Sequence, residues 1–391
     1  MTPAARISAA IEVLDSWLAG AGRAERLLRD WGKANRYAGS KDRRAVGDIV
    51  YSCIRRQRSF DWVSGATGGR ALAHGYCQAE GIPLEDIFSG QRFAPLHLSD
   101  DERTKSEQSA PDPVRLDHPD WLEQPLRDAL GDEYEPAMIA LGGRAPLDLR
   151  VNLLKADVAG AQAALKADGV ETEAMAGCST ALRAAAGAKV LQSAAYADGL
   201  VEIQDMASQI AAELASPKDG DRVLDFCAGG GGKALALAAL ADCRVDAWDI
   251  APARMKDLPE RARRAGANIR VLGEAPETDG VYDLVFVDAP CSGSGTWRRE
   301  PEAKWALTPE RLAELCEAQR DAFSAALAHC KVGGRIVYAT CSVLLAENED
   351  QVARFAEVYP MPKPVKSMRL VPSEDATGTD GFFCQVFERQ S

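Results

Sequence analysis

The sequence has few of the residues that metal centres and disulfide scaffolds use. Its 391 residues include four histidines, and none of its ten cysteines belongs to a Cys-x-x-Cys pair. We therefore expect no metal site, and most of the thiols read as small core residues in a reducing compartment. The chain also lacks an uncharged apolar run of about 18 residues and an apolar N-terminal signal core, so we expect no membrane span and a cytoplasmic location.

An excess of acidic residues gives the chain a net charge of −12, which by itself argues against a nucleic-acid partner. The distribution is uneven, however. Residues 1–60 hold 12 Lys or Arg and 6 Asp or Glu, whereas residues 80–135 hold 5 and 15. A basic face can therefore exist on this acidic protein. Five arginines on or beside one expected helix fit either a solvated face or an RNA-facing surface: Arg43, Arg44, Arg55, Arg56 and Arg58.

The pattern of apolar residues changes along the chain. Residues 4–66 read as helices, 99–113 is the best linker candidate, and 147–151 alternates like a strand. From 221 onward strands and helices alternate, which predicts a parallel sheet. Its expected strands are 222–226, 244–248, 269–272, 283–287, 335–340 and 382–387. We expect four parts: helical 1–75, an acidic linker with helices over 76–140, a small α/β module over 141–205, and a large α/β domain over 206–391.

A glycine-rich loop follows the first of these strands. Residues 221–233 read as a strand that breaks into four glycines, with a helix beginning at Ala234, and such a loop lets the backbone approach a ligand. Ala234 removes the hydroxyl that a P-loop needs, and the Gly-x-Gly-x-x-Gly spacing of dinucleotide sites is not met. Asp249, 20 residues beyond Gly229, ends the next strand, where an acid commonly holds a ribose. The pattern suits S-adenosylmethionine at least as well as NAD, and a simple tight turn is the plainer alternative.

Two cysteines follow short apolar runs that read as buried strands. Cys291 lies in Asp-Ala-Pro-Cys-Ser-Gly, and Cys341 lies in Ala-Thr-Cys-Ser. Ligands in an open parallel sheet bind outside the carboxyl ends of the strands, so two thiols at that edge suggest covalent chemistry. The 50 residues between them (341 − 291) leave room for one crossover helix, at about 309–329. Buried core thiols are the alternative interpretation.

These motifs resemble the NOL1/NOP2/Sun family of RNA cytosine-5 methyltransferases. The resemblance lies in residues 201–209, 225–233, 288–295 and 338–349, it covers about 145–391, and it extends more weakly to a NusB-like N-terminal domain. It implies an α/β fold: a Rossmann-like class I methyltransferase domain with a mostly parallel seven-stranded sheet, preceded by a small α/β (RNA-recognition-like) module and an N-terminal all-α NusB-like domain. The chain departs from the family loop where Gly230 replaces proline and Ala234 replaces threonine.

The resemblance also implies a role for each site residue. Cys341 would be the nucleophile that adds to carbon 6 of cytosine, and Asp288 would hydrogen-bond the edge of the base. Cys291 would assist loss of the carbon 5 proton and release of Cys341, and Lys233 would complete the catalytic set. Asp249 would bind the ribose, and Cys227 would pack the loop. The residues expected at the S-adenosylmethionine site are Cys227, Ala228, Gly229, Gly230, Gly231, Gly232, Lys233, Asp249 and Asp288.

Residues 296–305 interleave cations with two tryptophans, a pattern that favours contact with phosphates and unpaired bases. We expect RNA contacts from Arg298, Arg299, Lys304 and Trp305, and from Arg150 in the small module. The resemblance implies a monomer that acts on small-subunit (16S) ribosomal RNA, whose target base must be flipped out of its stack. Transfer RNA is an alternative substrate, and a non-catalytic RNA-binding ribosome assembly factor is an alternative function.

Overall fold

The computed structural model describes residues 1–103, 109–276, 280–359, 362–375 and 378–390. The chain forms two compact units. One consists of residues 1–127, 131–144 and 297–306, and the other of 128–130, 145–296 and 307–391. The linker predicted at 99–113 falls partly outside the described residues. The four expected domain boundaries stay predictions.

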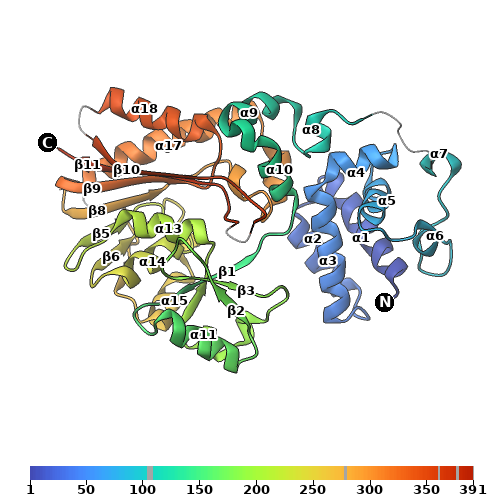
Figure 1. The fold of residues 1–391 in the computed structure, drawn as a ribbon, viewed down its shortest axis with the longest axis horizontal. Helices are drawn as coiled ribbons and strands as arrows, with labels where there is room; N and C mark the ends of the chain where they lie inside the picture. Colours follow the sequence, from blue (N-terminus) through green and yellow to red (C-terminus); the bar gives the residue numbers. More distant parts are fainter. Residues whose placement is uncertain (104–108, 277–279, 360–361, 376–377, 391) are drawn as a thin grey trace. The chain divides into compact units, whose positions relative to one another are not determined.

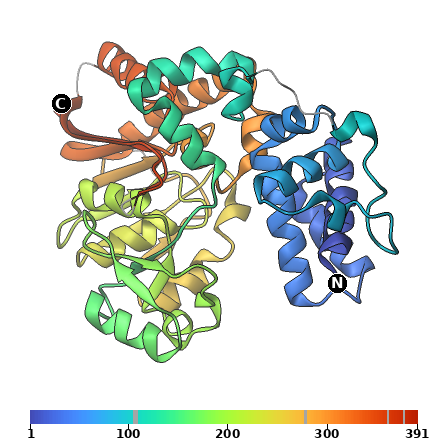
Figure 2. The ribbon, with the colours of Figure 1, turned by 45° about the vertical axis from the view of Figure 1, so that its right-hand side comes forward.

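The first unit is all-helical. Helices α1 (Pro3–Leu18), α3 (Ser40–Arg55) and α5 (Gly69–Ala79) pack against one another, and Figures 1 and 2 show them side by side. Thr2 caps α1 by accepting the Ala5 N–H at 3.1 Å, which satisfies a donor that a helix start leaves free. The other helices of this unit are α2 (Ala24–Ala34), α4 (Gln57–Ser64), α6 (Leu84–Ile87), α7 (Asp100–Arg103), α8 (Asp112–Arg115), α10 (Tyr134–Gly142) and α16 (Pro301–Ala306). Helix α9 (Glu123–Leu130) begins in this unit, and its last three residues belong to the other unit.

A small four-stranded sheet opens the second unit. Its order is β2-β3-β1-β4, and all of its pairs are antiparallel. Leu149 and Val151 of the central strand are buried with Leu165 of α11, which covers one face. Its elements are β1 (Leu147–Val151), α11 (Val158–Ala167), β2 (Thr172–Ala174), β3 (Ala181–Ala184), α12 (Ala194–Ala197) and β4 (Val201–Ile203).

A seven-stranded sheet forms the rest of this unit, in the order β10-β11-β9-β8-β5-β6-β7. The four pairs from β9 to β7 are parallel, and β11 runs antiparallel to both of its neighbours. The strands are β5 (Arg222–Asp225), β6 (Arg244–Ala247), β7 (Ile269–Val271), β8 (Tyr282–Asp288), β9 (Cys330–Thr340), β10 (Pro362–Leu370) and β11 (Phe382–Arg389). The helices are α13 (Met206–Ala215), α14 (Gly232–Leu240), α15 (Leu258–Ala265), α17 (Pro309–His329) and α18 (Glu349–Val358).

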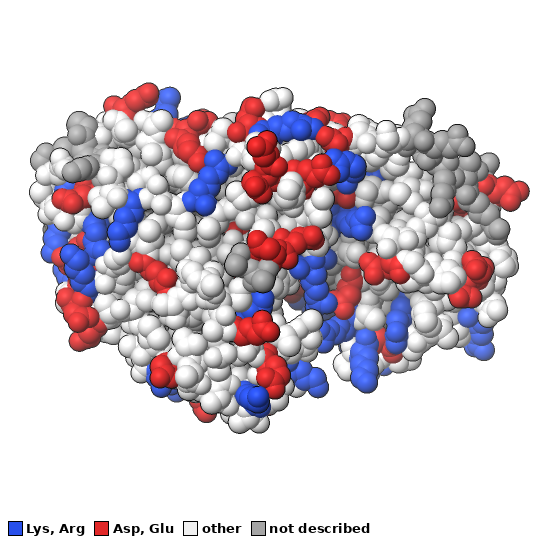
Figure 3. Space-filling view, viewed as in Figure 1, with Lys and Arg blue, Asp and Glu red and all other residues white. Residues whose placement is uncertain are grey.

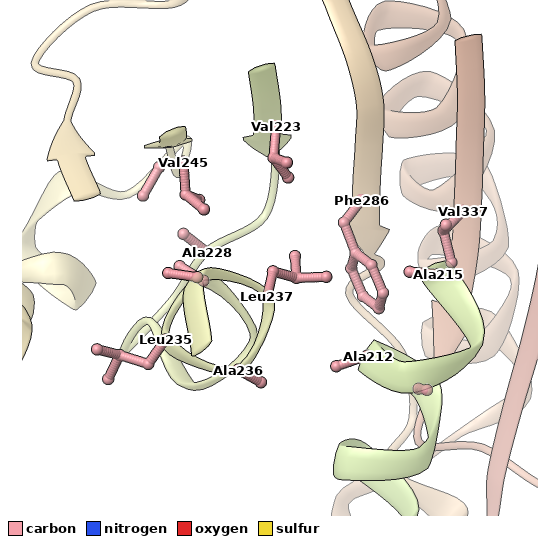
Figure 4. Packing of buried hydrophobic residues seen from close by; sticks show 14 of the residues in the cluster. Ala212, Ala215, Val223, Ala228, Leu235, Ala236, Leu237, Val245, Phe286 and Val337 are labelled. Carbon is pink, nitrogen blue, oxygen red and sulfur yellow. The ribbon is translucent and has the colours of Figure 1, made fainter. Parts of the chain in front are cut away.

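Helices bury both faces of this sheet. On one face, α13, α14 and α15 enclose an aliphatic core, in which Leu237 points toward Phe286 of β8 and Ala215 lies near Val337 of β9 (Figure 4). On the other face, Phe323 of α17 stacks on Phe355 of α18 with ring centroids 3.9 Å apart. Burial on both faces explains why these strands read as continuous apolar runs.

The predicted fold class is confirmed, since a mostly parallel seven-stranded sheet follows a small α/β module and N-terminal helices. Sequence reasoning missed β10, because prolines and lysines in an edge strand give no apolar run. No helix in the described ranges is both long and apolar enough to cross a membrane. Within those ranges, no three His, Cys, Asp or Glu side chains are grouped as a metal ion would require.

Candidate active site

The two cysteines meet at the carboxyl edge of the large sheet. Strands β8 and β9 are parallel neighbours, with Asp288 level with Ala339, so the loops that follow them start side by side. The sulfur atoms of Cys291 and Cys341 lie 3.4 Å apart. The remaining eight cysteines are free thiols as well, but this pair alone among the described residues brings two sulfurs into contact.

A lysine from the glycine loop reaches the same edge. The Lys233 ammonium, at the first turn of α14, donates a hydrogen bond of 2.8 Å to Asp288 Oδ2. Burial alone would lower the pKa of Lys233, but the charge of Asp288 and its hydrogen bond outweigh burial and raise that pKa. The ammonium also interacts electrostatically with Cys341 and Asp225, so it stays charged among anionic groups.

The two thiols have different electrostatic surroundings. The pKa of Cys291 is raised well above its usual range, first by the hydrogen bond with Cys341, then by burial and the charges of Cys341 and Glu347. Cys341 instead faces the Lys233 ammonium. Cys291 therefore lies near the Glu347 carboxylate, whereas Cys341 lies near the Lys233 ammonium.

Glu347 joins the two cysteine-bearing loops, a role that sequence reasoning did not predict. The side chain is fully buried. Its Oε1 accepts the Ser292 N–H at 2.8 Å, and its Oε2 accepts the hydroxyls of Ser292 and Ser342 at 2.5 and 2.6 Å. Ser292 follows Cys291 and Ser342 follows Cys341, so one carboxylate fixes the spacing of both thiols. Its place in the motif Glu347-Asn348-Glu349 was the available signal, but only the folded chain shows these contacts.

Neighbouring hydrogen bonds reinforce this link. The amide of Gln319 donates to Glu347 Oε1 and to the carbonyl of Pro290, both at 3.0 Å. The hydroxyls of Ser294 and Ser342 lie 2.8 Å apart, and the Gly295 N–H donates to the Cys341 carbonyl at 2.9 Å. Both loops are therefore held as one rigid surface.

The glycine loop lies at the end of β5, with conformations that only glycine adopts easily. Gly229 and Gly231 have φ angles of +51° and +81°. A Cβ atom on Gly231 would lie 2.2 Å from Leu258 Cδ1, so a larger residue cannot fit. The Asp249 carboxylate accepts the Gly229 N–H at 2.8 Å and pairs with Arg254 at 3.0 Å. Asp249 thus shapes the loop, and its contact with a ribose stays a prediction.

Other loop residues take structural positions. Burial raises the pKa of Cys227, as expected of a thiol that packs the loop, and Ala228 donates its N–H to the Trp248 carbonyl at 2.9 Å. The carbonyls of Gly230 and Gly232 accept hydrogen bonds from Arg261 and Gln204.

Arg150, for which we expect contact with RNA, is buried in the small module, and that contact stays a prediction. It is 3% exposed, and its Nε donates to Gln204 Oε1 at 2.7 Å. Burial lowers its pKa to about 10. Since Gln204 in turn donates to the Gly232 carbonyl at 3.2 Å, Arg150 supports the glycine loop.

The segment 297–306 belongs to the helical unit. Arg298 and Lys304 are 3% and 1% exposed, and their contact with RNA stays a prediction. The Lys304 ammonium donates to the Arg55 carbonyl at 2.8 Å, and the Trp305 indole donates to the Ile54 carbonyl at 2.6 Å. Local spacing could not reveal this, because the partners lie about 250 residues away in sequence. Contact of RNA with the partly exposed Arg299 and Trp305 stays a prediction.

The sheet order, with a glycine loop after β5, is that of a Rossmann-like methyltransferase. Residues 212–385 match the model of the 16S rRNA methyltransferase RsmB/F family, and residues 118–191 match its ferredoxin-like domain. The ribosomal RNA small subunit methyltransferase B of Vibrio cholerae is 33% identical over 74% of this chain and 70% of its own length. The chain therefore belongs to the NOL1/NOP2/Sun family and is most similar to its RsmB members.

Solved structures agree with this assignment. The crystal structure of PH0851 is 26% identical, covers 100% of this chain and 99% of its own, and has a TM-score of 0.77. NSun6 from Pyrococcus horikoshii, solved with SFG, is 17% identical over 70% of this chain and 98% of its own, with a TM-score of 0.59, and shows the shared fold.

The residues beside the loop fit a cofactor that carries positive charge. Asp225, at the end of β5, is completely buried, and neither of its carboxylate oxygens has a hydrogen-bond partner within the described residues. Burial and the nearby Asp288 raise its pKa to about 7. A buried carboxylate without a partner is costly, and a cationic ligand would offset that cost. Sequence reasoning missed Asp225, although its position directly before the glycine loop was a signal.

Proposed function

We propose that this protein transfers a methyl group from S-adenosylmethionine to carbon 5 of a cytosine in small-subunit ribosomal RNA, through a covalent adduct with Cys341. The observation that carries the proposal is the contact between the Cys291 and Cys341 sulfurs, 3.4 Å apart, beside the Lys233–Asp288 pair. Two thiols, an acid and an ammonium at one sheet edge match the groups that cytosine C5 methylation requires.

Cys341 is the nucleophile of the pair. The thiolate is the reactive form of cysteine, and the Lys233 ammonium favours negative charge at Cys341. Its sulfur forms a bond to carbon 6, and the ring electrons shift so that carbon 5 becomes nucleophilic. S-adenosylmethionine, when bound, supplies an electrophilic methyl group.

Asp288 orients the base. It lies at the end of β8, three residues before Cys291, and Lys233 fixes its Oδ2 atom. Hydrogen bonding from the cytosine amino group to this carboxyl orients carbon 6 toward Cys341, and the neighbouring Lys233 ammonium offsets the negative charge that develops on the ring.

Cys291 acts in release. Its hydrogen bond with Cys341 is the largest cause of its raised pKa, and that cause disappears once Cys341 has become a thioether. The Cys291 thiol then loses its proton to water more readily, and the resulting Cys291 thiolate accepts the proton from carbon 5. The C5–H electron pair forms the C5=C6 bond, the C6–S bond breaks, and Cys341 leaves as a thiolate.

The glycine loop and its neighbours hold the cofactor. Asp225 faces its positive charge, Asp249 lies where ribose hydroxyls bind, and the Gly229 and Gly231 backbone admits close approach. Relatives that carry the name ribosomal RNA small subunit methyltransferase B support ribosomal RNA as the substrate.

Single cysteine variants test the chemistry. Cys341→Ala should abolish transfer of a tritiated methyl group to RNA. Cys291→Ala should instead accumulate a protein–RNA adduct that survives a denaturing gel. Cys53→Ala, which removes a buried thiol of the helical unit, is the matched control and should do neither. Full activity of Cys341→Ala would disprove the mechanism.

Base-resolution mapping of 5-methylcytosine tests the substrate. Ribosomal RNA from cells with and without the gene should differ at a small-subunit position. A difference confined to transfer RNA would show that transfer RNA, and not ribosomal RNA, is the substrate. If no RNA differs and calorimetry detects no binding of S-adenosylmethionine, a non-catalytic assembly factor would be favoured.

A further inference from the structure

Arg44 is an exposed cation of the helical unit, but three of the other arginines that the sequence suggested are not exposed. Arg55 is half-buried and donates to the Arg298 carbonyl at 2.8 Å. Arg56 lies over the Phe60 ring at 4.7 Å, and Arg58 pairs with Asp120 at 2.6 Å. These three side chains are therefore engaged within the unit.

The exposed cations are on α2, on the turn after it and on the start of α3. Residues 23–44 hold eight Lys or Arg and three Asp or Glu, a net charge of +5 in a chain of net charge −12. Figure 3 shows Lys and Arg side chains exposed over these two helices. We define the α2–α3 basic surface as Arg29, Lys33, Arg36, Tyr37, Lys41 and Arg44, all exposed.

These cations are held in a regular array. On α2, Arg29 and Lys33 are one turn apart, on the face opposite the buried Trp31. In the part of the chain that the structure describes, the side chains of Arg29, Arg36 and Arg44 have neither an ion pair nor a hydrogen bond. Lys33 has only the exposed Asp30, at 3.4 Å. The positive charge of this surface is therefore available to a binding partner, because acidic side chains of the same chain do not neutralise it.

An aromatic ring stands within the array. Tyr37, in the turn between the two helices, is 73% exposed, although burying an aromatic ring is strongly favourable. An exposed ring among cations is the combination that binds single-stranded RNA, with cations on phosphates and the ring under a base. An acidic protein partner would be attracted by the cations but gives no reason for the ring.

We propose that the α2–α3 basic surface binds single-stranded substrate RNA, with Arg29, Lys33 and Arg36 on successive phosphates and Tyr37 stacked on an unpaired base. The proposal rests on the proposed function in taking RNA as the substrate. It assigns to the helical unit the capture of RNA outside the catalytic site. The rest of the chain, with a net charge of −17 (−12 minus +5), repels RNA, so a local cationic array is needed for capture.

The test measures binding of a ribosomal RNA fragment to the full-length protein at several salt concentrations. Arg29→Glu, Lys33→Glu and Arg36→Glu combined should weaken binding roughly 10- to 100-fold and reduce the slope of log K against log [salt] by about 2, at about 0.7 per phosphate. Tyr37→Ala should weaken binding about 5-fold or more while leaving that slope unchanged. The residues are exposed, so the melting temperature should not change.

A matched control separates local from global charge. Reversing Lys166, Arg263 and Arg311, which are exposed cations of the second unit, changes the net charge equally. An equal loss of affinity in this control would overturn the proposal, as would unchanged binding in the α2–α3 variant. Loss of an acidic protein partner with RNA binding intact would also overturn it.

Failure of the proposed function gives a different result. If the protein binds RNA through this surface but transfers no methyl group, the proposed function is wrong and the proposed RNA-binding surface is supported. If the α2–α3 variant methylates a short oligonucleotide normally but the long RNA poorly, both the proposed function and the proposed RNA-binding surface are supported.

Discussion

Replacing Glu347 by glutamine should slow methyl transfer without weakening the binding of S-adenosylmethionine. Glutamine preserves the size of the side chain and the oxygen that accepts from Ser292 N–H and Gln319. It puts an NH2 group where Oε2 accepts the hydroxyls of Ser292 and Ser342, at 2.5 and 2.6 Å. Those hydrogen bonds to a charged acceptor are each worth about 1.5–3 kcal/mol, against about 1 kcal/mol for neutral ones.

The net loss is about 2 kcal/mol, because both hydroxyls can turn and accept from the new amide. If that energy holds the two sulfurs in place, kcat should fall about 30-fold. The KM for S-adenosylmethionine should not change, because among the described residues the hydrogen bonds of the Glu347 carboxylate go to Ser292, Ser342 and Gln319 and not to the glycine loop. Steady-state kinetics on RNA, with melting temperatures measured in parallel, test this expectation.

Glu349→Gln is the control. It makes the same change two residues along the chain, on a side chain that is 40% exposed and pairs with Arg369 at 3.0 Å, so its effect should be under about 1 kcal/mol. Equal activity of Glu347→Gln and the wild type would refute the positioning role. So would a loss of activity explained wholly by unfolding at the assay temperature.

Three further predictions concern other parts of the chain. Gly231→Ala should lower the free energy of unfolding, measured by chemical denaturation, by roughly 3 kcal/mol, through backbone strain and a clash with Leu258. Gly220→Ala is the control: its φ is also positive (+83°), but no atom lies within 4 Å, so it should cost only about 1 kcal/mol. Equal costs of the two substitutions would contradict the clash. Hydrogen peroxide should oxidise Cys291 and Cys341 to a disulfide while being reduced to water, with activity restored by dithiothreitol and no such bond in Cys291→Ala by mass spectrometry. Burial lowers the pKa of Lys304 to about 8 from 10.5, so the cost of burying its charge is fully present below pH 8 and disappears as the pH rises toward 10.5. The wild type should therefore gain up to about 3 kcal/mol relative to Lys304→Met across that range, and parallel curves would exclude the effect.

The sequence was most informative where local pattern determines structure. Apolar runs located β5, β6, β8 and β9, and the crossover helix was predicted at 309–329, the observed bounds of α17. Because parallel strands end at one edge, the topology also accounts for the meeting of Cys291 and Cys341.

What escaped prediction depends on contacts distant in sequence. Glu347 reads as one acid among many until Ser292, 55 residues earlier, is seen to bind it. Lys304 and Arg298 carry charges that local patterning assigns to the surface, yet both side chains are buried, and the Lys304 ammonium donates to the Arg55 carbonyl. Charge type alone does not reveal burial.

The helical unit is a discontinuous fold, completed by ten residues from far along the chain. A shortened protein beginning at residue 145 would strip Trp305 of its Ile54 partner and leave the Lys304 ammonium without the Arg55 carbonyl. Since residue 297 comes only six positions after Cys291, that damage would begin next to the reactive thiols. The N-terminal helices therefore cannot be removed without exposing residues 297–306. Truncations or gene fusions that separate residues 1–144 from the rest of the chain should yield a poorly folded protein.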